Sequence, residues 1–248
     1  MNFKAFIFLS FIIIFCSSCK KAPLCDCFDN AGPPASDNRT PDLTYFNQID
    51  IHDNINVNLS IGAQEQVIIE GGQNLIKNIS ATVSNNVLTL KNENNCDWLR
   101  SYKKSSITVN ITMPEVTNID NEGVGNIQGA DTITTPDFNI QVLSSGNVGL
   151  AVHSNSILAF QFGSGVLTLT GECSSFEENF YGGTGFLYSD SLITGYTYIS
   201  SSSTGNCYVN TNGQLDVIIN QIGNVYYSGN PHPIHLKSNG SGQLIKFN

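Results

Sequence analysis

A glycine followed two positions later by an apolar residue recurs seven times in this sequence. The glycines are Gly125, Gly146, Gly165, Gly185, Gly205, Gly223 and Gly242, with spacings of 21, 19, 20, 20, 18 and 19 residues. The segments between them are rich in β-formers rather than helix formers. A period of about 20 residues built from such segments is typical of a β-solenoid. We therefore predict an all-β protein, a right-handed parallel β-helix with rungs of about 20 residues.

Alignment on the repeated glycine predicts how the side chains stack. The residue two positions later is apolar in all seven repeats: Ile127, Val148, Leu167, Leu187, Cys207, Val225 and Leu244. Because side chains alternate between the faces of a strand, this column should point inward and form a continuous core. Cys207 is then a small core residue rather than a reactive thiol. A disulfide between Cys207 and Cys173 would require their two columns to lie side by side.

The turn that carries the glycine also has a pattern of its own. Asparagine follows the glycine at Asn126, Asn147, Asn206 and Asn224. Asparagine tolerates the left-handed backbone of a turn, and we expect the stacked amides to hydrogen-bond one another in a ladder. The glycine itself is expected where the turn requires a positive φ.

Three tyrosines stand three positions after the glycine in successive repeats: Tyr188, Tyr208 and Tyr226. This position should face outward, so the sequence predicts an exposed aromatic ladder. Tyrosine offers apolar area and a hydroxyl at low entropic cost. Three interpretations stay open: mutual stacking alone, self-association into a homo-oligomer, or binding of a glycan or protein ligand.

The N-terminus has the pattern of an export signal. Lys4 precedes a mainly apolar run of ten residues, Phe6–Phe15, which is too short to cross about 30 Å of hydrocarbon as a helix and suits a signal peptide. Ser17-Ser18-Cys19 resembles a bacterial lipobox, although Cys16 stands where leucine is usual. We predict that Cys19 is acylated and anchors the protein in the outer membrane. The sequence is compatible with either leaflet of that membrane. An ordinary secretory signal with incidental cysteines is the alternative.

The region after Cys19 is expected to be a tether, because its prolines block regular strand pairing. It contains Cys25 and Cys27, and we expect one of them, Cys27 in the preferred pairing, to form a disulfide with Cys96. A metal site there would need further ligands, and none is nearby in the sequence. The predicted organisation is a signal peptide at 1–18, a lipid anchor and tether at 19–42, and a β-solenoid head domain at 43–248, with wider strands at 43–116 and regular rungs at 117–248.

Residues 43–113 alternate apolar and polar side chains with a period of two, which indicates strands. Two of these runs flank Asn85-Asn86 and predict a hairpin. The strands should form the first rungs of the solenoid or a small sheet that covers its end, because an open end is an unpaired edge.

A loop at 92–104 interrupts these strands and holds Trp98, Arg100 and Tyr102. A positive, aromatic loop on an acidic protein is a candidate contact site. The alternative is a long hairpin loop, folded back by a Cys96 disulfide with Trp98 packed against the body.

The formal net charge of −9 disfavours non-specific binding to nucleic acid or anionic lipid. Arg39 and Arg100 are the only arginines, so a bidentate phosphate clamp is hard to build. Nucleic acid is therefore not an expected partner.

The lipobox, the Val67-Ile68-Ile69-Glu70-Gly71-Gly72 strand, the loop Asn95-Cys96-Asp97-Trp98-Leu99-Arg100-Ser101-Tyr102 and the glycine repeats together resemble one known group. It is the putative auto-transporter adhesin, head GIN domain family of exported Bacteroidetes proteins. The resemblance covers roughly residues 43 to 240. It implies an all-β, β-helical exported protein, and it brings no catalytic residues with it.

Some parallel β-helices cleave polysaccharides and use clustered carboxylates to do so. Glu177 and Glu178 are adjacent and should point to opposite faces of a strand. His232 and His235 lack a third ligand and are better explained as exposed residues of the last rung, while His52 and His153 are isolated in the sequence. We expect no catalytic residues, no metal and no cofactor.

These observations predict a non-catalytic cell-envelope lipoprotein that acts as an adhesin-like binding module. The alternatives are a self-associating envelope scaffold and, last, a polysaccharide-active β-helix enzyme.

Overall fold

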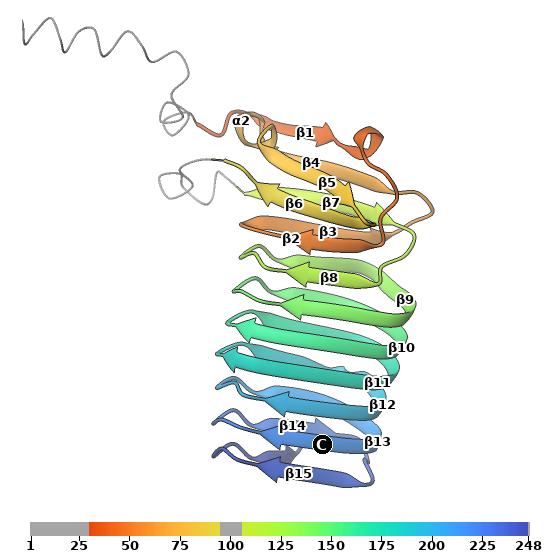
Figure 1. Cartoon of the computed structure of the whole chain (residues 1–248), viewed down its shortest axis with the longest axis vertical. Coiled ribbons are helices and arrows are strands. Elements are labelled where there is room, and N and C mark those ends of the chain that lie inside the picture. Colours follow the sequence, from red (N-terminus) through yellow and green to blue (C-terminus); the bar gives the residue numbers. More distant parts are fainter. Residues whose placement is uncertain (1–29, 95–105, 248) are drawn as a thin grey trace, which may run out of the picture.

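The glycine repeats form the coils of a parallel β-solenoid, which confirms the predicted fold class (Figure 1). The computed structural model describes residues 30–94 and 106–247. The solenoid has about seven turns, with roughly 19 residues in each. Its long strands are β9 (Ile127–Val142), β10 (Val148–Gly163), β11 (Val166–Gly183), β12 (Phe186–Ser201) and β13 (Cys207–Ile219).

Each long strand contributes to two walls of the stack. The start of β9 pairs in parallel with β3 (Ile55–Ile61), whereas its end pairs in parallel with β8 (Asn118–Asn121). We call the stack that follows the repeated glycine the first wall and the stack that precedes the next glycine the second wall. At the C-terminal end, β14 (Val225–Ser228) and β16 (Leu244–Lys246) continue the first wall, and β15 (Ile234–Ser238) continues the second.

The N-terminal third supplies both further coils and a cover for the end. β2 (Gln48–Ile51) and β3 lie directly on β8 and β9, and the next coil is made by β6 (Val87–Asn92) and β7 (Ile107–Met113), all parallel. β4 (Gln66–Gly72) then pairs antiparallel with β7, and β5 (Ile79–Ser84) pairs antiparallel with β6. Both expectations for this region therefore hold at once.

Two local features of this cap test the sequence patterns. β5 and β6 form the predicted hairpin, and Asn85 and Asn86 take φ values of 51° and 65°, as a type I′ turn requires. The expectation that prolines keep the tether unpaired up to residue 42 is wrong, because β1 (Pro34–Asn38) pairs antiparallel with β4. Proline is tolerated there because β1 is an edge strand and Pro34 is its first residue.

Short helical segments accompany the cap: α2 (Gln73–Ile76) and the 3₁₀ turn η2 (Thr40–Asp42). In the part of the chain that the structure describes, no helix combines the length and the hydrophobicity needed to cross a membrane.

The predicted apolar column forms the core of the first wall. Ile127, Val148, Leu167, Leu187, Cys207, Val225 and Leu244 are paired in register from coil to coil. All are buried except Leu244 in the last coil, which is half-buried. A second column of the core runs through the second wall and includes Ile119, Ile140, Ala159 and Ile199. The core is thus one continuous apolar interior shared by all coils.

The reason for the repeated glycines differs from the predicted one. None of the seven has a positive φ. Instead, a Cβ at Gly146, Gly185 or Gly205 would overlap the carbonyl oxygen of the glycine one coil earlier, and the other four meet a carbonyl oxygen in the same way. The backbones of successive turns approach so closely that only glycine fits.

The asparagines also bond differently from the prediction. The side-chain oxygen of Asn126 accepts the backbone N–H of Asn147 at 3.0 Å, and that of Asn206 accepts the backbone N–H of Asn224 at 2.9 Å. The ladder therefore joins side chain to backbone rather than amide to amide. This ladder does not need the left-handed backbone that was expected of the asparagines. All four have negative φ: Asn126, Asn147, Asn206 and Asn224.

Candidate functional site

The predicted tyrosine ladder exists on the outer surface of the first wall. Tyr188, Tyr208 and Tyr226 are register partners on adjacent coils. Their ring centroids lie 5.2 Å and 4.8 Å apart, and the ring planes differ by 15° and 8°. Tyr188 is 39% exposed, and the other two are half-buried. The spacing equals the distance between neighbouring strands, so the backbone sets the stacking distance.

Two further aromatic rings pack beside the ladder. The ring of Phe186 stacks on Tyr188 with centroids 6.0 Å apart. The ring of Phe247 meets Tyr208 and Tyr226 edge-on, at interplanar angles of 86° and 79°. The stacked rings therefore cover one another's faces. The ladder presents mainly ring edges and hydroxyls to solvent. Aromatic edges carry partial positive charge and favour oxygen atoms or the faces of other rings.

The ladder continues into a groove on the same wall. The column that contains Tyr188 begins with Gln128, Gly149 and Thr168, which are register partners. These residues line a groove of about 550 Å³ together with Leu150 and Thr170. Gly149, which has no side chain of its own, lies in this groove beside the Gln128 side chain. Ladder and groove together form a strip that runs along the solenoid axis, which we call the axial strip.

Several predicted site residues cannot be placed on this surface. Trp98, Arg100 and Tyr102, as well as Cys19, Cys25, Cys27 and Cys96, lie outside the described residues. Their predicted roles in contact, lipidation and disulfide formation remain predictions.

The two described cysteines are buried and free. Cys207 stands in the core column as predicted, and burial raises the pKa of its thiol far above the usual range, with the Glu178 carboxylate adding to the rise. Burial also raises the pKa of the Cys173 thiol to about 12. Both thiols are thus neutral and poor nucleophiles near pH 7.

Glu177 and Glu178 point to opposite faces, as predicted. Glu177 is exposed and accepts a hydrogen bond of 2.8 Å from the Asn179 side chain. Glu178 lies in the core between Ala159 and Ile199, fully buried, and neither carboxylate oxygen has a hydrogen-bond partner. Burial raises its pKa to about 8. Its alternation with the buried Phe176 and Phe180 is the signal that could have placed this carboxyl inside.

A polar network on the second wall was not predicted either. Asp216 accepts hydrogen bonds from Tyr196 at 3.0 Å and from Gln214 at 3.0 and 2.8 Å, and it lies 2.7 Å from His235. Burial opposes ionisation of Asp216, but the hydrogen bonds from His235, Gln214 and Tyr196 hold its pKa below the usual value. Burial and the bond to Asp216 raise the pKa of Tyr196 to about 12. His232 and His235 are exposed in the last coil, as predicted.

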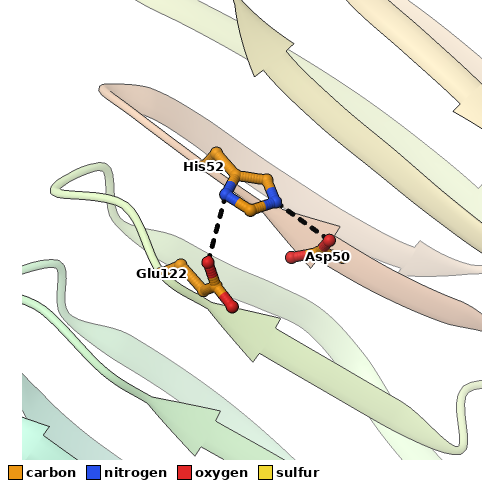
Figure 2. A group of neighbouring side chains, drawn as sticks. All are labelled: Asp50, His52 and Glu122. Atoms are coloured by element: carbon orange, nitrogen blue, oxygen red, sulfur yellow. Dashed lines mark hydrogen bonds and ion pairs between the residues drawn. The ribbon is translucent and has the colours of Figure 1, made fainter.

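His52 is not isolated in space, although it is isolated in the sequence. Figure 2 shows its ring between two carboxylates, with Nε2 2.9 Å from Asp50 Oδ2 and Nδ1 3.2 Å from Glu122 Oε2. Asp120 pairs with Asp50 on the neighbouring strand. Burial raises the pKa of Asp120, and the charges of Asp50 and Glu122 raise it further. His153 has a simpler environment, with Glu172 2.8 Å away.

A sequence signal for this group exists in retrospect. Asp50 and His52 alternate around one inward residue, and Asp120 and Glu122 do the same around another. Each pair therefore presents two polar side chains on one outer face. Only the register between β2 and β8 shows that the two pairs are neighbours.

Comparison with known proteins agrees with this architecture. The family profile described as putative auto-transporter adhesin, head GIN domain, matches residues 45–231. No curated protein matches the sequence.

Solved structures of similar fold come from Bacteroides and Parabacteroides species. A putative adhesin from Bacteroides fragilis is 21% identical, with a TM-score of 0.79 over 87% of this chain and 97% of that chain. A putative adhesin from Parabacteroides distasonis is 17% identical, with a TM-score of 0.68 over 87% of this chain and 98% of that chain. A putative lipid binding protein from the same species is 15% identical, with a TM-score of 0.68 over 89% of this chain and 99% of that chain. At these identities the likeness concerns the fold.

Proposed function

This chain belongs to the putative auto-transporter adhesin, head GIN domain family, and on that premise we propose that it is a non-catalytic binding module of the cell envelope. Its ligand-binding surface is the axial strip of the first wall. The ligand is an extended glycan or polypeptide that lies along the solenoid axis. Family and fold both point to a protein that is not an enzyme.

One observation carries the proposal: the ladder and the groove share a single register column. Gly149 and Thr168 lead directly to Tyr188 and Tyr208 on successive coils. Strands repeat about every 4.8 Å, so an extended ligand would meet an equivalent outward side chain at each coil. The groove offers room and backbone polar groups, and the ladder offers ring edges and hydroxyls. This is the arrangement expected for a repeating ligand rather than for a compact metabolite, which would need an enclosed pocket.

The experiment is retention of the protein starting after Lys21 on arrays of glycans and extracellular-matrix proteins. Tyr188→Ala removes the most exposed ring of the ladder, and we expect at least a tenfold loss of retention on the ligands bound by the unaltered protein. The matched control is Tyr181→Ala, because Tyr181 is 65% exposed and its ring also stacks on one neighbour, Phe160, at 5.9 Å. Equal retention by both variants and the unaltered protein would contradict the proposal.

Self-association is a second candidate, favoured by the mutual stacking of the rings. Because the inner ring faces are already covered, the exposed edges of one ladder would meet the hydroxyl oxygens of the same strip in a second copy. Light scattering of the lipid-free protein over a range of concentrations tests this. We expect a dimer that Tyr188→Ala returns to a monomer. A monodisperse monomer at high concentration removes this candidate.

The family also points to the cell envelope as the location. We propose that Cys19 carries the lipid that holds the protein at the outer membrane. Mass analysis of the N-terminal peptide of membrane-extracted protein tests this, and an unmodified Cys19 in that fraction would refute it.

A further inference from the structure

We propose that Asp50, His52 and Glu122 bind a first-row divalent cation, with Zn²⁺ as the best match, at the junction between the cap and the regular coils. The site lies on a different part of the molecule from the axial strip, and it stands independently of the binding function proposed above. We call these three residues the junction cluster (Figure 2).

The backbone places the junction cluster on two adjacent coils. β2 and β8 are parallel neighbours, with Asp50 paired to Asp120. The backbone N–H of Glu122 donates to the carbonyl of Ile51 at 2.9 Å, and the N–H of His52 donates to the carbonyl of Leu90 at 3.1 Å. Both side chains therefore project from residues that are fixed by bonds between coils. A cation held by this cluster would join the cap coil to the first regular coil.

The imidazole of His52 lies where a positive charge would be stabilised. Each ring nitrogen faces a carboxylate oxygen, at 2.9 Å for Asp50 and 3.2 Å for Glu122. A neutral imidazole has only one N–H, so one of these contacts would set a lone pair against a carboxylate. A second proton or a metal ion removes that repulsion.

The surroundings of the junction cluster also lack positive charge. Asp50 Oδ1 and the neighbouring Asp120 Oδ1 are buried atoms without a hydrogen-bond partner. Among residues 30–94 and 106–247, no lysine or arginine forms an ion pair with Asp50, Asp120 or Glu122. Two carboxylates thus flank a single imidazole, and a third, that of Asp120, stands on the register neighbour of Asp50. A divalent cation would offset this excess of negative charge better than one proton on His52.

The ligand atoms fit the dimensions of one metal ion. One atom from each residue of the junction cluster lies within 4.8 Å of the others. Ligands about 2.0–2.2 Å from a metal lie about 3.3 Å apart at a tetrahedral edge, so a modest side-chain movement brings all three into range. One imidazole with carboxylates suits Zn²⁺, whereas Ca²⁺ and Mg²⁺ prefer oxygen alone. The His52 and Asp50 side chains are 24% exposed and that of Glu122 is 48% exposed, which leaves a path for entry.

Zn²⁺ titration of the metal-free protein lacking only residues 1–21, followed by calorimetry, tests the proposal. We expect one Zn²⁺ per chain, at least tenfold weaker binding in His52→Ala and Glu122→Gln, and no comparable binding of Mg²⁺ or Ca²⁺. The matched control is His153→Ala, which removes a histidine that contacts one carboxylate, and it should bind as the unaltered protein does. Saturating Zn²⁺ should also raise the Tm of the unaltered protein by about 5 °C.

The outcomes separate a metal site from a protonated histidine. Binding lost in His52→Ala and Glu122→Gln but kept in His153→Ala supports the site. Absence of stoichiometric binding, or binding that both cluster variants retain, overturns it. If His52→Ala fails to fold by circular dichroism, Glu122→Gln decides, because Glu122 is the most exposed member and glutamine keeps its size.

Discussion

Glu178 is the residue least expected from its surroundings. It occupies a core column between Ala159 and Ile199, and its carboxylate oxygens have no hydrogen-bond partner. A charged group in such a place is costly, so the carboxyl is held neutral by a raised pKa. Glu178 is therefore a polar group that lowers the stability of the core rather than one that supports it.

The raised pKa makes stability depend on pH in a defined direction. The pKa of Glu178 rises from 4.5 to about 8 on folding, so between these values the unfolded chain ionises while the folded chain stays protonated. Stability should fall as pH rises through that window, by about 1.4 kcal/mol per pH unit, and level off above about pH 8. Urea unfolding at several pH values, compared with Glu178→Gln, measures this slope.

Two variants separate the charge from the polarity. Glu178→Gln removes ionisation but leaves an unpaired polar group, so it should flatten the pH dependence. Glu178→Met also removes the polarity, and it should add a further gain of about 1–3 kcal/mol at every pH. A pH dependence that is the same in all three proteins would show that Glu178 does not titrate in this range.

Sequence reasoning located this carboxyl only in part. Alternation correctly placed Glu177 and Glu178 on opposite faces, and the apolar Phe176 and Phe180 on either side of Glu178 mark its face as the inner one. Charged residues are almost never fully buried without a partner, so the natural expectation runs against the structure. The repeated glycines show a similar limit, because their recurrence was visible while its cause, the approach of another coil, is a property of the stack.

At the scale of the elements, the glycine column fixes how closely the turns of neighbouring coils approach. A Cβ at Gly205 would overlap the carbonyl oxygen of Gly185, which belongs to backbone and cannot move away alone. Gly205→Ala should therefore force two coils apart and lower the free energy of unfolding by about 3 kcal/mol or more. Chemical denaturation measures the loss.

Gly149 provides the matched control for this substitution. A Cβ there would meet the Gln128 side-chain oxygen at 3.0 Å, and that exposed side chain, held only by a long 3.4 Å hydrogen bond to the Gly129 carbonyl, can turn away. Gly149→Ala should change stability by less than about 1 kcal/mol. Equal losses in the two variants would mean that close approach of the turns is not the reason for the glycine column.

Elements with a local signal were predicted well, and those without one were not. The β5–β6 hairpin follows from two alternating runs and the Asn85-Asn86 turn. β1 has no apolar alternation and begins at Pro34, so nothing in its own sequence indicates a strand. It forms because β4 offers an unpaired edge.

At the scale of the whole molecule, the order of strands in the stack departs from their order in the chain. β3 lies between β7 and β9 in the stack. The chain therefore builds the segment from β4 to β7 on the side of β3 that faces away from β9, and then returns to β8 beside β9. This path brings Asp50 and His52 beside Glu122. A repeat pattern predicts contacts between successive coils, but it does not predict such a return. The junction cluster was therefore out of reach of the sequence, while the tyrosine ladder was within it.

Because the core column that follows the repeated glycine keeps its pairing from one regular coil to the next, the number of coils sets the height of the stack. Inserting one whole repeat would move the far end of the ladder by about 4.8 Å and leave every remaining neighbour relation intact. Chains with more or fewer repeats would therefore hold the same surface at different distances from the cap.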